Sequence, residues 1–146
     1  MTSERQLCTF FLGKYCFGID VLDVQEVFRY QEMTSVPLAS DEITGLINLR
    51  GQVIMAINLR LRLGMDALPE GQTSMNVVVR AQGDVISLLV DRIGDVLEAS
   101  EDTYEDAPDT IQGVMRELVR GVYKLENRLL LILDIKKVVQ CETVAA

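Results

Sequence analysis

The amino-acid sequence predicts an all-β fold with a few short helices, arranged as two small β-barrels. Hydrophobic residues make up 49% of the 146 residues and are rich in Val, Ile and Leu, whereas aromatic residues make up 5%. This composition favours short aliphatic strands. Apolar stretches alternate with turn residues at regular intervals, which is typical of small barrels rather than of a parallel sheet. A hairpin-like segment also occurs twice.

The repeated segment covers residues 45–60 and returns 76 positions later (121 − 45). Gly51 then matches Asn127, and both residue types accept the left-handed conformation of a tight turn. A second match aligns residues 24–27 with 93–96 at a shift of 69 (93 − 24). The pattern favours a duplicated subdomain, although two hairpins with core-facing aliphatics also look alike. The pairs are Gly45 with Gly121, Leu49 with Leu125, Val53 with Leu129, Met55 with Leu131, Ile57 with Leu133, Asn58 with Asp134 and Leu59 with Ile135.

The N-terminal segment predicts two strands, residues 7–12 and 15–21, joined by a turn at Gly13-Lys14. Residues 20–27 continue as extended chain. Because their apolar positions recur every third residue, a helical turn competes with the strand there.

A hairpin is predicted at residues 45–63, with its tight turn at Arg50-Gly51. An edge-like stretch at 30–36 precedes it, followed by the entry to a short helix for which Ser40 is a candidate N-cap. The second strand of the hairpin has two faces. The expected core face carries Val53, Met55, Ile57, Leu59 and Leu61, and the other carries Ile54, Ala56, Asn58 and Arg60.

The second half of the chain predicts a hairpin around Gly83 and, after an acidic stretch, the repeated hairpin. The acidic stretch, residues 98–110, lacks the glycine and the ligand spacing of a calcium loop, so we expect a solvated connector. We expect two subdomains, 15–80 and 81–135, completed by the terminal segments. The expected elements are strands at 76–80, 84–91 and 93–97, a helix at 111–119 interrupted by Gly113, the hairpin at 121–135 and a helix around 136–141.

Charge and cysteine content restrict the class of protein. Fourteen basic against 22 acidic residues give a net charge of −8, which argues against a nucleic-acid partner. The longest apolar runs are far shorter than a membrane span, and the N-terminus lacks a signal-peptide core, so we expect a cytoplasmic protein without membrane insertion. The absence of His excludes a Cys/His zinc site. We expect Cys8, Cys16 and Cys141 to be reduced thiols, with no metal or cofactor.

The sequence shows no arrangement of catalytic residues. It has no phosphate-binding glycine loop, no dinucleotide fingerprint and no nucleophilic Ser in an elbow setting. The pairs Asp91/Asp95 and Asp20/Asp23 have spacings that do not bring two carboxylates to one site in a strand, so we expect turn or strand-edge roles. The Gly, Arg and aliphatic residues of the turns and strands favour a surface that binds another protein.

The most distinctive motif runs from Asn48 to Ile54, Asn-Leu-Arg-Gly-Gln-Val-Ile, and continues at 57–60. It resembles the signature of the CheW-like family of bacterial chemotaxis coupling proteins. Further matches extend the resemblance over essentially the whole chain: residues 11–13, 18–21, 24–27, 89–91, 94–97, 121–122 and 128–134.

The resemblance implies two SH3-like five-stranded β-barrels packed together, without catalytic activity. It implies an adaptor that links the cytoplasmic tip of chemoreceptors to the regulatory domain of the histidine kinase CheA, in receptor arrays at the inner membrane. An adaptor of type IV pilus twitching motility or of phototaxis is an alternative. A small-ligand binding protein is another, and it needs a deep pocket with convergent polar groups between the barrels.

The resemblance also implies a receptor-facing groove between the barrels, whereas kinase-contacting residues are not assigned. In this groove Val24 can pack, Arg50 can donate several hydrogen bonds and Gly45 can let a receptor helix approach closely. A bracing ion pair with Glu26 is the alternative for Arg50, and simple core packing is the alternative for Val24. The implied receptor-binding residues are Val24, Glu26, Gly45, Asn48, Arg50 and Gly51.

The chain departs from the family pattern at two positions. Met55 stands where Pro is common, and Asn58 stands where Asp is common. An aliphatic side chain at Met55 should pack acceptably. The lost charge at Asn58 leaves a salt bridge to Arg60 in doubt.

Overall fold

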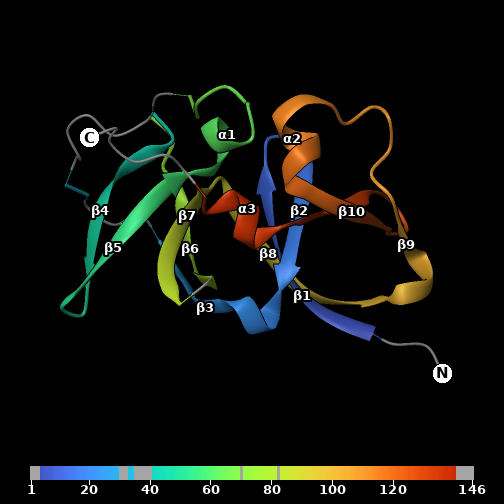
Figure 1. Ribbon diagram of the computed structural model, residues 1–146, viewed down its shortest axis with the longest axis horizontal. Coiled ribbons are helices and arrows are strands. Elements are labelled where there is room, and N and C mark those ends of the chain that lie inside the picture. The colour runs from blue at the N-terminus through green and yellow to red at the C-terminus, as the bar shows by residue number, and fades with distance from the viewer. Residues whose placement is uncertain (1–3, 30–32, 35–40, 70, 82, 141–146) are drawn as a thin grey trace.

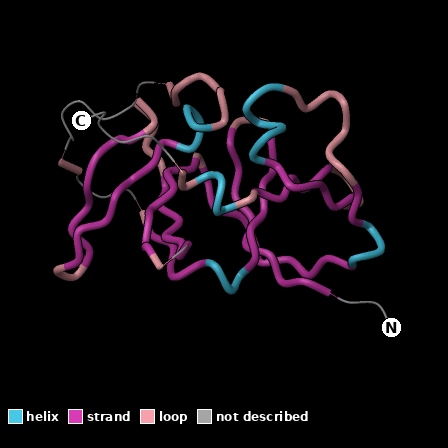
Figure 2. The backbone as a smooth tube through the Cα atoms, in the orientation of Figure 1, coloured by secondary structure: helices cyan, strands magenta, loops and turns pink. Residues whose placement is uncertain are grey.

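The computed structural model describes residues 4–29, 33–34, 41–69, 71–81 and 83–140 as a succession of short strands and single-turn helices (Figures 1 and 2). None of the helices in this described part has the length and hydropathy of a membrane span. The strands are β1 (Glu4–Leu12), β2 (Tyr15–Asp20), β3 (Val24–Phe28), β4 (Ile43–Leu49), β5 (Gln52–Asn58), β6 (Met75–Ala81), β7 (Asp84–Val90), β8 (Arg92–Ser100), β9 (Tyr104–Glu105), β10 (Val119–Lys124) and β11 (Leu129–Leu133). The helices are η1 (Val21–Asp23), α1 (Leu59–Arg62), η2 (Glu101–Thr103), α2 (Gly113–Leu118) and α3 (Ile135–Val138), with η marking 3₁₀ turns.

The strands form two sheets that lie side by side (Figure 1). The first sheet has the order β3-β6-β7-β5-β4, and the second has the order β8-β1-β2-β11-β10-β9. The predicted all-β fold of two SH3-like subdomains is confirmed. The second sheet has six strands instead of the expected five because the two-residue β9 pairs with β10.

The second sheet is built from both ends of the chain. β1 and β2 pair with β8 and β11, so the first sheet holds residues 24–90 and the second holds 4–20 and 92–133. The boundary expected between residues 80 and 81 falls within the β6–β7 hairpin. A division into the folding units 15–80 and 81–135 stays a prediction.

The pairing of the strands confirms the internal repeat. Gly45 pairs with Ala56 in the first hairpin, and Gly121 pairs with Ile132 in the second, at positions related by the shift of 76. Both ladders shift register immediately before that glycine. The second strand of each hairpin then runs parallel to a strand of its own sheet, β5 to β7 and β11 to β2. The two hairpins therefore share their register shift and their parallel neighbour, as expected for a duplicated segment.

The two hairpin turns differ, which corrects the expectation that Gly51 and Asn127 share a left-handed conformation. The angle φ is +52° at Arg50 and +86° at Gly51, as in a type I′ turn. Within the described residues Arg50 is the only non-glycine residue with positive φ, so Asn127 does not share this conformation. In the second turn the Leu125 N–H donates to the Arg128 carbonyl at 2.9 Å.

The second strand of the first hairpin is shorter than predicted, and its buried face differs from the predicted one. It ends before Leu59, which lies in α1. Val53, expected to face the core, is 64% exposed, and Met55 is half-buried, whereas Ile54 and Ala56 are buried. A strand of a small barrel twists and has sheet neighbours on both sides, so its buried face changes along its length and strict alternation fails.

The other elements mostly match their predictions. The competition at residues 20–27 resolves into both structures, η1 followed by β3. Part of the acidic stretch forms η2 and β9 instead of a connector, and the predicted helix begins at Gly113 instead of being interrupted there. The C-terminal helix α3 is shorter than expected. Ser40, Cys141 and most of residues 30–36 lie outside the described residues.

One continuous apolar core joins the two sheets. It includes Phe10 and Phe17 from the second sheet and Val77 and Leu88 from the first, all almost completely buried. Each sheet also has a smaller apolar cluster of its own. The clusters contain Ile47, Ala56 and Leu89 in the first sheet, and Leu7, Cys16, Ala99, Tyr123, Leu130 and Ile132 in the second.

Asn58 and its repeat partner Asp134 cap two short helices. Asn58 Oδ1 accepts the Leu61 N–H at 3.2 Å, and Asp134 Oδ1 accepts the Lys137 N–H at 3.3 Å. The departure from the family pattern at Asn58 therefore keeps a helix-capping side chain but removes the negative charge that favours a helix N-terminus.

We expect Asn58→Asp to stabilise the chain by about 0.5 kcal/mol, because a carboxylate caps α1 as well as an amide and adds a favourable interaction with the helix dipole. Urea denaturation at neutral pH measures the gain. Asn58→Ala is the control, with an expected loss of about 1 kcal/mol. An unchanged or lower midpoint for Asn58→Asp would contradict the capping role.

Candidate functional site

Arg50 and Glu26 form a two-pronged ion pair across the first sheet. Arg50 Nη1 donates to Glu26 Oε2 at 2.7 Å, and Nη2 donates to Oε1 at 2.8 Å. Glu26 lies in β3 and Arg50 lies in the β4–β5 turn, and β3 and β4 are the two edge strands of this sheet. The ion pair therefore links the two edges of the sheet. Hydrogen bonds from Arg50 lower the pKa of Glu26, so the carboxylate stays ionised.

The turn from Asn48 to Gly51 holds the Arg50 guanidinium in position. Asn48 Oδ1 accepts the Gly51 N–H at 2.9 Å, and Gly51 takes its positive φ at little steric cost. The side chain of Arg50 is 70% exposed in spite of the ion pair, whereas that of Glu26 is 24% exposed. The carboxylate occupies two of the five guanidinium N–H donors and leaves the others for a partner.

Gly45 is required by the packing of the chain itself. The backbone of Thr34 exchanges two hydrogen bonds with Leu46, at 2.9 and 2.7 Å. A Cβ atom at Gly45 would lie 2.6 Å from the Thr34 carbonyl oxygen. Its repeat partner Gly121 is approached by β9 in the same way. The close approach of a receptor helix is therefore not needed to explain this glycine.

The six residues implied to bind the receptor do not all meet. Val24 is half-buried against the shared core, and Gly45 lies farther along β4 beneath Thr34. The bracing ion pair and the core packing that were the alternatives for Arg50 and Val24 are thus both present. The residues that gather at the hairpin turn are Glu26, Asn48, Arg50 and Gly51. Receptor binding by the six stays a prediction.

The second hairpin cannot form the same ion pair. The repeat shifts place Glu126 and Asp95 at the two positions, and two carboxylates do not attract each other. The guanidinium of Arg128 lies over the Phe11 ring instead, 5.4 Å from its centroid, and that of Arg92 lies 4.6 Å from the same centroid. The exposed arginine of the first hairpin thus has no counterpart in the duplicate.

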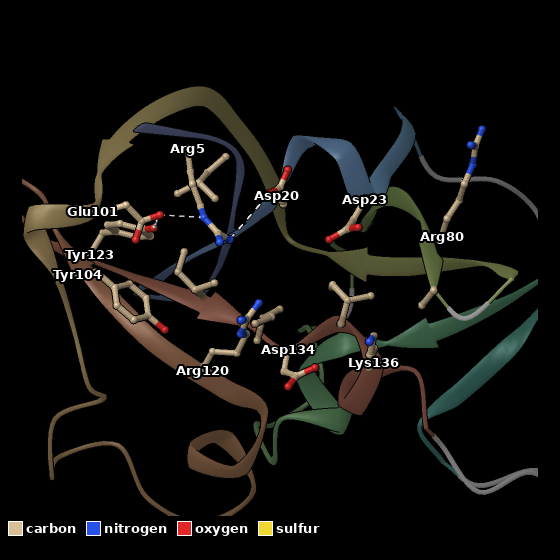
Figure 3. Close-up of a pocket in the computed structure, with 15 residues that line it drawn as sticks. Arg5, Asp20, Asp23, Arg80, Glu101, Tyr104, Arg120, Tyr123, Asp134 and Lys136 are labelled. Carbon is tan, nitrogen blue, oxygen red and sulfur yellow. Dashed lines mark hydrogen bonds and ion pairs between the residues drawn. The ribbon is translucent and has the colours of Figure 1, made fainter. Parts of the chain in front are cut away.

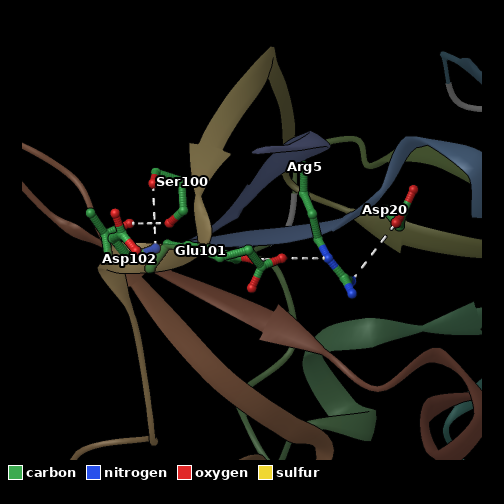
Figure 4. Close-up of polar contacts among 7 residues, drawn as sticks. Arg5, Asp20, Ser100, Glu101 and Asp102 are labelled. Carbon is green, nitrogen blue, oxygen red and sulfur yellow. Dashed lines mark hydrogen bonds and ion pairs between the residues drawn. The ribbon is translucent and has the colours of Figure 1, made fainter. Parts of the chain in front are cut away.

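A charged cavity of about 430 Å³ lies between the two sheets (Figure 3). Arg5 pairs there with Glu101 at 2.9 Å and with Asp20 at 3.9 Å (Figure 4). Figure 3 shows Asp23 on the wall opposite Lys136. Burial and the nearby Asp20 raise the pKa of Asp23. The charged residues of the lining are Arg5, Asp20, Asp23, Arg80, Glu101, Arg120, Asp134 and Lys136.

From the sequence, a polar pocket between the barrels was only what a small-ligand binding protein would need, and the residues that line this cavity were not predicted. Asp20 was expected to be a turn residue, and it does cap η1 by accepting the Leu22 N–H at 2.9 Å. Arg5, Arg120 and Lys136 come from opposite ends of the chain, so no local motif connects them. None of the six implied receptor-binding residues lines the cavity.

The family model of the CheW-like domain matches residues 6–142. The chain belongs to the CheW-like family. Curated relatives include the chemotaxis protein CheW of Bacillus subtilis, 33% identical over 97% of this chain and 90% of the relative, and that of Treponema pallidum, 31% identical over 92% of this chain and 81% of the relative. The crystal structure of the scaffolding protein TtCheW from Thermoanaerobacter tengcongensis is similar, with a TM-score of 0.86 and 26% identity over 96% of this chain and 95% of the other. The predicted membership is confirmed, and the chain is a chemotaxis adaptor of this family.

Proposed function

We propose that the chain couples chemoreceptors to the histidine kinase CheA by binding both partners, without catalysis of its own, in the bacterial cytoplasm. Membership of the CheW-like family supports this proposal. The duplicated fold supports it as well, because each barrel offers a separate exposed surface and an adaptor must hold two partners at once.

The observation that carries the receptor contact is the exposed, fixed guanidinium of Arg50. It is held by Glu26 and by a type I′ turn, so little side-chain entropy is lost when it binds a partner. A receptor tip is a helical hairpin with carboxylate and amide groups, and the free N–H donors of Arg50 match such acceptors. The duplicate hairpin lacks this feature, so the receptor contact is assigned to the first barrel.

The structural roles of several carboxylates support a non-catalytic function. Asp20 and Asp134 cap helices, and Glu101 pairs with Arg5. The sequence also contains no His to act as a general base.

Exposed apolar residues of the second barrel support a kinase contact there. Val96 is 57% exposed and Leu129 is 37% exposed. The repeat relates them to Val27 and Val53, which are 45% and 64% exposed on the first barrel. Because the receptor is assigned to the first barrel, we assign the kinase to Val96 and Leu129.

We expect Val96→Asp to weaken kinase binding by about tenfold, since a charge replaces an apolar contact at the interface. Isothermal titration with the regulatory domain of CheA measures the affinity. Val53→Asp on the first barrel is the matched control and should leave the affinity unchanged. Equal losses for the two variants would show that the kinase does not prefer the second barrel.

Reconstitution tests the proposed function directly. The purified chain is mixed with soluble receptor-tip fragments and CheA, and co-sedimentation and kinase autophosphorylation are measured. We expect a ternary complex and stimulated autophosphorylation only when all three components are present. Absence of both the complex and the stimulation would overturn the proposal.

A further inference from the structure

Polar contacts between the two sheets gather around α1 and Asp91. Asp91 is the single residue between β7 of the first sheet and β8 of the second. The helix α1 follows β5 and carries Arg60 and Arg62. Arg62 Nε donates to the Val138 carbonyl at 2.9 Å, and Nη2 donates to the Lys137 carbonyl at 2.7 Å. Both carbonyls belong to α3, which follows the second sheet, so α1 links the two sheets.

The carboxylate of Asp91 binds groups from both sheets. Arg60 Nε donates to Oδ1 at 2.8 Å, Arg60 Nη2 donates to Oδ2 at 2.6 Å, and the Gly13 N–H in the β1–β2 turn donates to Oδ2 at 2.7 Å. The Asp91 N–H also donates to the Phe11 carbonyl at 3.1 Å. The side chains of Arg60 and Asp91 are both 14% exposed. The salt bridge of Arg60, which Asn58 left in doubt, is therefore made with Asp91.

The charge of Asp91 is held by its hydrogen bonds. Burial raises the pKa of this carboxyl, but the donors Arg60 and Gly13 outweigh burial, and the pKa lies below its usual range. Charge-assisted hydrogen bonds of this kind are short and directional. Three donors on one carboxylate therefore fix the position of α1 relative to the β1–β2 turn.

The polar contacts around the cavity differ from those around Asp91. The ion pair of Arg5 with Asp20 and the hydrogen bond from Arg80 Nε to Gln25 Oε1 at 2.9 Å each stay within one sheet. The link between the sheets on this side is η1, which joins β2 to β3. Lys136, the repeat partner of Arg60 (136 − 76), lines the cavity and makes no hydrogen bond or ion pair described in the structure. In Figure 1, α1 lies at the top of the molecule, and η1, which borders the cavity, lies at the bottom between β2 and β3.

The shared apolar core and the directional polar contacts constrain the angle between the barrels together. Hydrophobic burial is non-directional and depends on the area removed from water, so it keeps the barrels together. Hydrogen bonds depend on distance and direction, so they select one relative orientation. The directional contacts and the cavity meet at α3, because Arg62 donates to its Lys137 and Val138 carbonyls and its Ile135 and Lys136 line the cavity.

We propose that Arg60 and Asp91 are positioning residues that fix the angle between the two barrels. In the adaptor role this angle sets how a receptor on the first barrel and a kinase on the second lie relative to each other. This link to coupling rests on the proposed function, whereas the fixed angle itself does not.

Residual dipolar couplings of the isotope-labelled full chain test the fixed angle without any partner, because they report the relative orientation of the two barrels. We expect one alignment tensor to fit both barrels of the native chain. In Arg60→Met the barrels should need two different tensors while each barrel keeps its own structure. Arg5→Met removes an ion pair within the second sheet and is the matched control, for which one tensor should still suffice.

A single tensor for both barrels of folded Arg60→Met would overturn the proposal. If that variant does not fold, Arg60→Lys keeps the charge without the two-pronged geometry, and the same criterion applies. A second arm measures coupling: the variant should bind receptor tips and CheA singly as the native chain does, with several-fold less kinase stimulation. If the variant needs two tensors but stimulates the kinase normally, only the link between the angle and coupling is disproved. Failure of the native chain to couple would instead disprove the proposed function and leave the orientation result intact.

Discussion

Arg50→Glu is expected to leave the chain folded and to weaken receptor binding by about 30-fold or more, which is the usual effect of losing a central arginine of an interface. The substitution removes the guanidinium donors and places a carboxylate opposite receptor carboxylates. Kinase binding should be unchanged, because the kinase is assigned to the other barrel. Co-sedimentation with receptor tips and receptor-stimulated autophosphorylation measure the two effects.

A charge exchange separates binding from bracing. Arg50→Glu also breaks the ion pair with Glu26, so a loss of coupling could come from a loosened turn. The double variant with Arg50→Glu and Glu26→Arg can remake the ion pair in reverse. If Arg50 contacts the receptor, the double variant stays defective. Recovery of full coupling in the double variant would show that the residue only braces the first barrel.

Gly45→Ala is expected to destabilise the chain by about 2–3 kcal/mol, because the new methyl group would collide with the Thr34 carbonyl and break two backbone hydrogen bonds. For a chain of 146 residues this corresponds to a fall in Tm of roughly 6–10 °C. Differential scanning calorimetry measures it in the absence of any receptor.

Gly83→Ala is the matched control for this experiment. Gly83 has a φ of +84° and open space around its Cα, so the substitution should cost only about 1 kcal/mol, from backbone strain. A loss for Gly45→Ala that does not exceed this value would contradict the packing role. In that case a contact with the receptor would be the better explanation of Gly45.

Local patterns in the sequence predicted the strands and the repeat well. The β6–β7 hairpin around Gly83 and both copies of the repeated hairpin depend on alternation and turn residues, which are encoded within a few positions. The motif around Arg50 was likewise contiguous, and its alternative contact with Glu26 could be named from the sequence. The ion pair in the structure confirms that contact.

Features that depend on distant segments were not predicted. Asp91 was expected to be a solvated strand-edge or turn residue, and nothing near it in the sequence indicates Arg60 or Gly13 as partners. The cavity has the same origin, because its lining comes from both ends of the chain. The exposure of Val53 depends on the twist of a closed barrel, which a count of alternating residues does not contain.

The composition of the second sheet dictates an order of events during synthesis. β2 ends at residue 20, and the other neighbours of β1 and β2 in this sheet, β8 and β11, begin at residues 92 and 129, whereas the last strand of the first sheet ends at residue 90. The β1–β2 hairpin therefore leaves the ribosome well before β8 and β11, and the core around Phe10 and Phe17 is completed only when residues of both sheets are present. The β1–β2 hairpin is thus fully paired only after β11 has been made.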